Sequence, residues 1–594
     1  MKNKILKYTI VAALVFFFSG CIDESIPTNY ATADQVGGSE IALEAMSNAS
    51  AAFMYAYDYF GTLSSQEFGY PAMMLMRDAL TDAPYVTSNY NHFNTPWGSL
   101  VDFSSSRAKQ PWRYYYRMIL NSNQTINAIG DPEEHPERIQ RFYGNALVYR
   151  AMSYMDLMRQ YEYKKTGIPK LDNEAEANEI YGLTTVLIDE HFDSKDAENN
   201  PRVPFYHMIR FIMDDLNRAE KYLDGYNRPS KIRADLSVVE ALKARMWLEI
   251  ATRFQLNPED LATQLQHEND EELDVYDKLN ISSARDAYQM AQEYARKVIN
   301  KYSPLSEAQW HSTTNGFNDM SVSSWIFAIS INSIDAVHTR LNNLHSNAST
   351  EFSRGYSRSQ YHCYRMIDAA LYNKIDDNDW RKVTWIDPND AGKIPTPDKY
   401  HTLLGKLDEA DGSPVGTEWA LRDAYVGFKY RPNQGDISDD YKNALQVDYP
   451  IIRVEEMYFI EAEALAYTQG LGAGKSALEN FLNSYRYKPG STYQYSKEPT
   501  DVDDFINNYL ITQKRIELWG EGISYFDIKR RALQIKRGYE GSNWIRDYQY
   551  NSTPGYTASW LNFYVPREGE GTLNKAIKMN PDPQVYDVYN LWTN

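Results

Sequence analysis

The chain has 594 residues, only two cysteines and a formal net charge of −19. A chain of this length can bury a sizeable core, and it must do so without a disulfide framework. The acidic balance repels phosphates and anionic lipid headgroups, which argues against nucleic acid as a partner.

The N-terminal residues have the pattern of an export signal followed by a tether. A lysine-rich start precedes an apolar run over 10–18, which is too short to span a bilayer and is followed by Ser19-Gly20-Cys21. A cysteine directly after Ser-Gly is similar to a lipobox, in which Cys21 becomes the acylated first residue, although Phe18 stands where the usual pattern has leucine. We therefore expect a signal peptide over 1–20 and a lipidated tether over 21–40. The alternative is an ordinary signal peptide whose cysteine is incidental.

Beyond the tether, apolar residues recur every three or four positions in long windows, which is the period of an amphipathic helix. Gly130-Asp131-Pro132 ends the first of these windows, and Ser283 can open another. The predicted helices cover 112–129, 139–161, 206–223, 238–252, 283–300, 452–467, 476–485 and 502–518. They predict a mostly α fold, a tetratricopeptide-like scaffold of helix pairs without the strict repeat signature.

Long stretches between the helices carry no sustained period and are rich in proline, asparagine, serine and aromatic residues. They cover 63–110, 310–364, 387–449 and 536–594. Irregular stretches of this length are uncommon in a compact domain unless they have a function. We expect them to form a binding face on the helical scaffold.

Residues 470–476, Gly-Leu-Gly-Ala-Gly-Lys-Ser, invite comparison with a phosphate-binding loop. The pattern fails because Gln469 stands where the first glycine is required, and because a helix precedes the segment where a strand is needed. Glycines that end one helix and Ser476 as the cap of the next explain the segment. The histidines show no metal-binding spacing, and the acidic run 376–379 lacks the glycine and distal glutamate of a calcium loop. The sequence therefore predicts neither a metal nor a cofactor.

Five segments, in order behind the lipobox-like motif, resemble the SusD/RagB family of outer-membrane lipoproteins. The most specific is Lys-Arg-Ile-Glu-Leu-Trp-Gly-Glu-Gly over 514–522, followed by Tyr-Phe-Asp-Ile-Lys-Arg over 525–530. The others are 144–161 with Gly-Ile-Pro over 167–169, then 212–219, 241–248, and 453–464 with its Ala-Glu-Ala. Each alone is an ordinary amphipathic helix, but together they extend over most of the mature chain.

The resemblance implies one SusD-like domain over 41–594, with an N-terminal section over about 41–225 and a C-terminal section over about 283–594. It also implies a lipid-anchored protein on the outer face of the outer membrane, capping a TonB-dependent transporter of the SusC type. The acidic pair Asp23-Glu24 resembles the export mark of such surface lipoproteins, although it would equally keep a tether soluble.

The function that the resemblance implies is to bind a nutrient oligosaccharide and deliver it to the transporter, without catalysis. Capture of peptides by a lid of the RagB type stays open, as does a structural lid with little affinity of its own. A surface hydrolase would need two opposed carboxylates, which meet only in the fold.

Carbohydrate rings present apolar C–H faces and a fringe of hydroxyl groups, so their recognition favours an aromatic platform beside carboxylates, amides or arginine. The chain has 48 tyrosines, 22 phenylalanines and 12 tryptophans; most should fill the core, but the first two irregular stretches combine the required side chains. Trp97 fits a ligand platform and a loop core equally, whereas Trp325 lies in a strand-like run that favours core. The candidates are Arg77, Asp78, Tyr90, Asn94 and Trp97 in the first stretch, and Trp310, Trp325 and Tyr356 in the second.

Five charged residues of the most specific segment are Arg515, Glu517, Glu521, Asp527 and Arg530. They lie on a helix and turn that we expect to be partly buried, where charges need partners. We therefore expect mutual, hydrogen-bonded ion pairs among them rather than contacts to a ligand.

Overall fold

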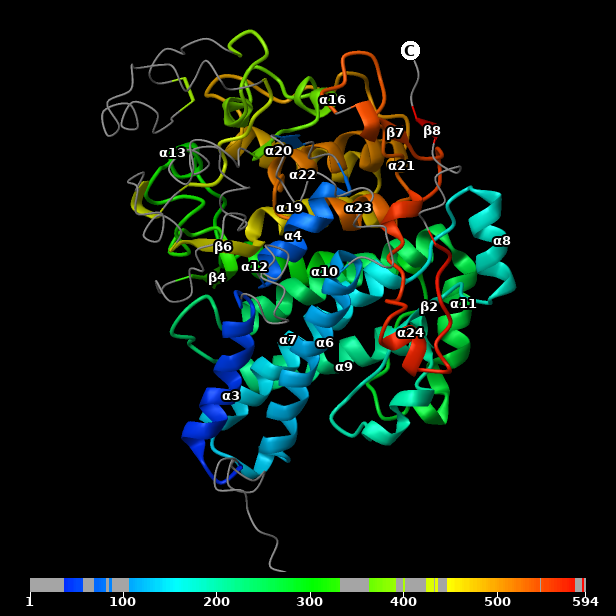
Figure 1. Ribbon diagram of the computed structural model, residues 1–594. Helices are drawn as coiled ribbons and strands as arrows, with labels where there is room; N and C mark the ends of the chain where they lie inside the picture. Colours follow the sequence, from blue (N-terminus) through cyan, green and yellow to red (C-terminus); the bar gives the residue numbers. More distant parts are fainter. Residues whose placement is uncertain are drawn as a thin grey trace, which may run out of the picture.

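The computed structural model describes residues 37–56, 69–81, 85–87, 106–331, 363–391, 399–400, 424–431, 433–435, 446–544, 546–582 and 590–591. Helices dominate these residues, and the strands among them are short and lie in two-stranded pairs (Figure 1). The mostly α fold predicted from the sequence is confirmed.

Long helices form the scaffold, and each packs against its neighbour along the chain. They are α3 (Glu40–Phe53), α6 (Ser106–Ile129), α7 (Glu137–Tyr161), α9 (Phe205–Leu223), α10 (Leu236–Leu256), α12 (Ala284–Ile299), α19 (Val454–Gln469) and α20 (Leu471–Tyr485). Contacts run from α6 through α7, α9, α10, α12 and α19 to α20 in that order (Figure 1). This succession is the tetratricopeptide-like stack of helix pairs that the sequence predicts.

Capping residues set the ends of several helices. The side chains of Asp235 and Ser283 accept hydrogen bonds of 3.2 Å from the third backbone N–H beyond them, and so begin α10 and α12. Gly470, with φ of +100°, makes the whole turn between α19 and α20. Ser476 lies inside α20, so the expectation that it caps a helix is wrong. One left-handed glycine is enough to reverse the chain there.

The helix α4 (Gly69–Ala79) lies in a stretch that the sequence predicts to be irregular, and that prediction is wrong. Every residue of α4 is buried. A helix without a polar face lacks the alternation by which surface helices are recognised. α4 crosses the centre of the molecule and packs against α23 (Ser524–Arg530) (Figure 1).

Short antiparallel strand pairs connect distant parts of the chain. They are β1 (Tyr85–Thr87) with β5 (Cys363–Arg365), β2 (Leu183–Val186) with β3 (Arg202–Pro204), β4 (Trp325–Ser330) with β6 (Asp448–Arg453), and β7 (Tyr550–Asn551) with β8 (Asn590–Leu591). The strand-like run around Trp325 is thus confirmed as β4. The helix predicted from 452 begins instead at Val454, because Ile452 and Arg453 complete β6.

The helical run predicted over 502–518 is continuous in the structure over 502–517. It consists of α21 (Val502–Asp504), the π-helical η10 (Phe505–Leu510) and α22 (Ile511–Glu517). The wider turn of η10 buries Phe505, Ile506 and Leu510 in an apolar cluster with residues of α19 and α20. α22 therefore enters the centre of the molecule as an extension of a well-packed helix.

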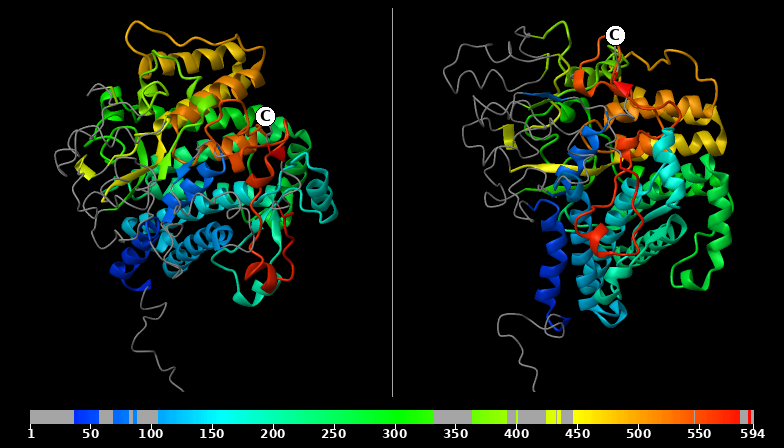
Figure 2. Two further views of the ribbon diagram at one scale, coloured as in Figure 1. Left: turned by 45° about the horizontal axis from the view of Figure 1, so that its top comes forward. Right: turned by 45° about the vertical axis from the view of Figure 1, so that its right-hand side comes forward.

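The C-terminal residues 557–580, which we call the C-terminal strap, return to the N-terminal half of the chain. Thr557 N–H donates to the Lys165 carbonyl at 3.0 Å, and the Asn580 amide donates to the Tyr161 carbonyl at 2.8 Å. Figures 1 and 2 show this red segment, including α24 (Glu570–Leu573), lying along the cyan and teal part of the molecule. The strap thus joins the beginning and end of the fold.

Candidate functional site

One short strand pair joins the two irregular stretches that carry the sequence candidates. In the β1–β5 pair, Tyr85 lies opposite Arg365 and Thr87 opposite Cys363. The chain leaves β1 after Thr87 and enters β5 at Cys363, so both stretches attach to the same end of this pair. We call the end of α4, the β1–β5 pair, and residues 366–372 and 424–431 the candidate face.

Residues 424–431 are held within this face by backbone hydrogen bonds to neighbouring segments. Val426 forms a bridge with Met366, and its carbonyl accepts a hydrogen bond of 3.0 Å from Ile386 N–H. Gly427 lies against Trp519, and a Cβ at this position would come within 2.6 Å of the Trp519 ring. The absence of a side chain therefore lets this segment pass between the strand pair and the helical scaffold.

Side chains from the C-terminal part of the chain hold the end of α4. The Arg537 guanidinium donates to the carbonyls of Ala79 at 3.2 Å and Thr81 at 3.3 Å, and the Trp560 indole donates to the Leu80 carbonyl at 2.9 Å. Carbonyls at a helix C-terminus lack partners within the helix and favour a nearby cation. Arg537 and Trp560 thereby fix the point from which the chain continues to β1.

Arg77 and Asp78, two of the predicted ligand contacts, point into the molecule. Arg77 donates to the Asp156 carboxylate at 2.9 Å, the Tyr115 hydroxyl at 3.0 Å and the Gly522 carbonyl at 3.0 Å. Asp78 accepts a hydrogen bond of 3.1 Å from Gly522 N–H. Both side chains are buried, so they hold α4 to the scaffold and present no surface to a ligand.

Trp310 and Trp325 are also part of the interior. The Trp310 indole donates to the Thr384 hydroxyl at 2.9 Å, and the Trp310 ring packs edge-on against Phe317. Trp325 is fully buried on β4, in agreement with the core interpretation favoured for it. Both tryptophans therefore pack in the core and are not exposed to contact a glycan. Core packing is the commoner role of a large aromatic side chain.

Tyr90, Asn94, Trp97 and Tyr356 lie outside the described residues, as does Cys21. The four ring and amide candidates belong to the two stretches that attach to the β1–β5 pair. Their role as glycan contacts and the lipidation of Cys21 stay predictions.

A buried network of charges lies beneath the candidate face. Its members are Asp379, Glu455, Glu517, Glu521, Arg381, Lys429, Arg453 and Arg486, each at most 5 % exposed. The Glu517 carboxylate is central: it accepts from Arg486 at 2.7 Å, Arg381 at 2.9 Å and Arg453 at 3.2 Å. Burial alone would raise the pKa of Glu517, but these arginines hold it well below its usual range. With as many acidic as basic members, the network needs no ligand to balance it.

Lys429 ties residues 424–431 into this network. Its ammonium donates to the carbonyls of Glu517 at 2.9 Å and Trp519 at 2.8 Å and to the Glu521 carboxylate at 2.6 Å. Burial lowers the pKa of Lys429 to about 8, against the attraction of Glu521. Burial would raise the pKa of Glu521, but Arg453 and Lys429 keep it below its ordinary value. The site is therefore structural: every donor of the ammonium group is used.

A second buried cluster involves the other charged residues of the 514–530 segment. Asp527 pairs with Arg530 and Lys514 at 2.9 Å each, and Arg530 also pairs with Glu463 at 2.6 Å. The expected mutual pairing is confirmed only between Asp527 and Arg530. Glu517 and Glu521 are paired as well, but their partners come from segments distant in the sequence.

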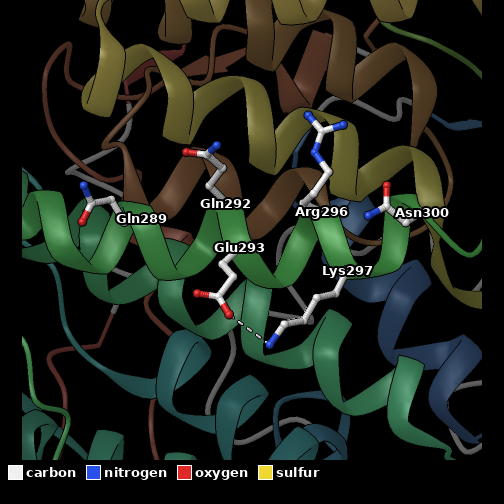
Figure 3. A pocket seen from close by; sticks show the side chains of 6 residues that line it. All are labelled: Gln289, Gln292, Glu293, Arg296, Lys297 and Asn300. Carbon is white, nitrogen blue, oxygen red and sulfur yellow. Dashed lines mark ion pairs between the residues drawn. The ribbon is translucent and has the colours of Figure 1, made fainter.

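A shallow recess lies on the outer face of α12 (Figure 3). Its lining consists of Gln289, Gln292, Glu293, Arg296, Lys297 and Asn300. Figure 3 shows Glu293 and Lys297 on one side of α12, where they pair at 3.0 Å, while Arg296 points to the other side and pairs with Glu461. With its charges paired and no aromatic residue in its lining, this recess lacks the platform that a sugar ring favours.

Metal sites and membrane spans are two further features that bear on function. In the described part of the chain, no three His, Cys, Asp or Glu side chains are grouped so as to hold a metal ion. Within the same residues, no helix combines the length and apolar character needed to cross a membrane.

Two protein-family models match the chain. One, described as starch-binding and associating with the outer membrane, matches residues 46–248. The other, the SusD family, matches residues 422–575 and so includes the 514–530 segment. Together the two ranges extend over more than half of the chain. No curated protein matches the chain in sequence.

Solved structures share the fold over nearly the whole chain. A SusD-like carbohydrate binding protein from Bacteroides vulgatus is 19 % identical with a TM-score of 0.62, and the alignment covers 90 % of this chain and 96 % of that one. A SusD superfamily protein from Bacteroides thetaiotaomicron is 17 % identical with a TM-score of 0.60, covering 91 % and 99 %. One from Parabacteroides distasonis is 14 % identical with a TM-score of 0.58, covering 93 % and 99 %. By its two matching family models and this shared fold, the chain belongs to the SusD/RagB family.

Proposed function

We propose that this protein is a cell-surface lipoprotein that binds a nutrient oligosaccharide and delivers it to a partner TonB-dependent transporter of the SusC type. Family membership carries the proposal, because the model matching residues 46–248 is described as starch-binding and as associating with the outer membrane. The protein of the same fold from Bacteroides vulgatus is a SusD-like carbohydrate binding protein, which supports the same ligand class. The protein binds its ligand without changing it.

Tyr90, Asn94, Trp97 and Tyr356 are the ligand contacts that we propose. The pairing of Thr87 with Cys363 supports this choice, because the two stretches that carry these residues attach to one end of the β1–β5 pair. Tyr90 follows Thr87 by three residues along the chain. Aromatic rings and amides near one place provide the stacking surface and hydrogen-bonding groups that a glycan needs.

The experiment that tests the proposal is binding of the purified protein to an array of oligosaccharides and peptides, followed by calorimetry on the best ligand. Flexible sugars lose conformational freedom on binding and exchange water for protein at little net gain, so we expect affinities of about −4 to −8 kcal/mol. Replacement of a stacking ring, Trp97→Ala, should weaken binding by roughly 1–3 kcal/mol and leave the melting temperature nearly unchanged.

The control is Trp310→Ala, which removes a buried ring and should lower the melting temperature by several degrees. If Trp97→Ala behaves like this control and still binds normally when folded, Trp97 is loop core. Binding confined to peptides would favour the RagB type of lid, and no binding at all would favour a purely structural lid. Release of new reducing ends from a bound glycan, abolished by one Asp or Glu substitution, would replace the binding protein with a hydrolase.

A further inference from the structure

Arg537 lies between two tryptophans at the end of α4. Its guanidinium carbon is 4.2 Å from the ring centroid of Trp544 and 5.4 Å from that of Trp560, and all three side chains are buried. Such contacts between a cation and an aromatic face are strongest where water is excluded. The guanidinium edge remains directed at the carbonyls of Ala79 and Thr81. One side chain thus joins the last turn of α4 to the aromatic pair.

One of the two tryptophans, Trp544, also contacts the start of α16 (Ala369–Tyr372), which follows β5. The Trp544 indole donates to the Asp368 carboxylate at 3.0 Å, and the Tyr539 hydroxyl donates to the same oxygen at 2.9 Å. The other Asp368 oxygen accepts from Leu371 N–H at 3.1 Å and caps α16. The Asn543 side-chain oxygen accepts a further hydrogen bond, of 2.9 Å, from Ala369 N–H. The residues over 537–544 therefore hold both α4 and α16.

The β1–β5 pair lies between these two attachment points. Three residues separate Thr81 from Tyr85, and two separate Arg365 from Asp368. A pair of three-residue strands is marginal on its own and takes its orientation from what holds its ends. Arg537, Trp544, Trp560 and Asp368, which we call the Arg537 clamp, hold one end of each strand.

We propose that Arg537 is a positioning residue for ligand binding, which acts by holding α4 and α16, and with them the β1–β5 pair, in one orientation. The inference rests on the proposed function, since it assumes that the ligand binds at the candidate face. Lysine cannot replace arginine in this role. Its ammonium is a point charge without the planar fork that reaches two carbonyls while lying flat against an indole.

The test compares Arg537→Lys with a matched control, Arg210→Lys. Arg210 is likewise buried and donates to backbone carbonyls, those of Glu268 at 3.1 Å and Leu273 at 2.7 Å, but in the N-terminal half of the chain. Hydrogen exchange of the full-length protein reads out the clamp directly. We expect at least tenfold faster exchange in Arg537→Lys at the amides of 79–81 and of 369–372, and no change there in Arg210→Lys.

Binding to the oligosaccharide array provides the second measurement. We expect the array affinity to fall at least tenfold in Arg537→Lys, and to be retained in Arg210→Lys even if the two variants lose the same number of degrees in melting temperature. If Arg537→Lys does not fold, Trp544→Phe takes its place, because it keeps the ring and removes the indole donor to Asp368.

Each contrary outcome overturns a separate part of the inference. Faster exchange in only one of the two segments overturns the clamp. Faster exchange in both segments with unchanged array affinity overturns the positioning role. If the wild type binds no oligosaccharide on the array, the proposed function fails and the positioning role fails with it, whereas the exchange data still report on the clamp.

Discussion

Glu517 shows what one buried carboxylate contributes to this protein. Arg381, Arg453 and Arg486 surround it, and they hold its pKa well below the ordinary value despite its burial. In the unfolded chain the same carboxyl group titrates near its ordinary pKa. The folded state therefore binds the proton less readily, so the stabilisation is present above the unfolded pKa and is lost as the pH falls toward the folded one. The same reasoning applies to Glu521, whose pKa is also lowered.

Glu517→Gln is expected to lower the free energy of unfolding at pH 7 by about 3–5 kcal/mol, because it removes the negative charge that three buried arginines share. The difference from the wild type should shrink as the pH falls below about 4, where the unfolded wild-type carboxyl becomes protonated. Urea denaturation at pH 7 and at pH 3.5 measures both effects.

The control is Glu198→Gln, which breaks an exposed ion pair with Lys575. The side chain of Glu198 is 70 % exposed and that of Lys575 is 76 % exposed. Exposed pairs contribute little, so this variant should stay within about 0.5 kcal/mol of the wild type. A Glu517→Gln variant as stable as this control, or a loss that is the same at both pH values, would contradict the stabilising role of the network.

At the scale of elements, the turn after α22 determines where α4 lies. Gly522 has φ of +69°, and a Cβ there would come within 2.7 Å of the Met74 Cα in the middle of α4. Arg77 and Asp78 bond to the carbonyl and N–H of this same glycine. The backbone of the turn and the backbone of α4 are thus in direct contact, which only glycine permits.

Gly522→Ala should therefore cost more than the strain of a left-handed alanine, which is about 1–2 kcal/mol. Gly130→Ala measures that strain alone, because Gly130 has nearly the same φ, +68°, with nothing within 4 Å of its added Cβ. We expect Gly522→Ala to lose at least about 2 kcal/mol beyond this control in chemical denaturation, since α4 has to move. Equal losses in the two variants would show that α4 accommodates the methyl group.

The elements that could be predicted from the sequence are those with one apolar and one polar face. α9 and α12 carry such a stripe, and both appear within one residue of the predicted bounds. α4 could not be predicted, because a helix buried on all sides shows no alternation. The pairing of charges at Glu517 could be predicted from burial, but its partners Arg381 and Arg486 could not, since nothing local marks them. Arg537 and Asp368 are missed for the same reason: Arg537 contacts Thr81, 456 residues away along the chain, and Asp368 contacts Trp544, 176 residues away.

At the scale of the whole molecule, the N-terminal helix α3 and the candidate face are far from each other. Figure 1 shows α3 at the lower end and α16 at the upper end, and both views of Figure 2 keep the blue helix and the upper green segments apart. The predicted tether over 21–40 leads into α3, which begins at Glu40. A lipid on Cys21 would therefore hold the protein at the end opposite to the candidate face.

Cys21→Ala is expected to move the protein from the membrane fraction to the soluble fraction without changing its affinity for the ligand. Stable anchoring requires more than one acyl chain, so removal of the acylated residue should release the protein completely. Cys363→Ala is the matched control: it replaces the other cysteine of the chain, in β5, and should leave the protein in the membrane fraction. Unchanged fractionation of Cys21→Ala, together with no acyl label on the wild type, would contradict the anchor.

The C-terminal strap has a consequence for the order in which the protein can fold. A ribosome makes the chain from its N-terminus, so α7 and the segment over 161–202 exist long before residues 557–580 do. Yet the carbonyls of Tyr161 and Lys165 receive their hydrogen bonds from Asn580 and Thr557. The buried Arg202 guanidinium likewise donates to the Lys578 carbonyl at 3.0 Å and to the Asn580 side chain at 2.7 Å, so the first half reaches its final packing only when the strap is in place. The last residues to be made thus complete the fold of the first.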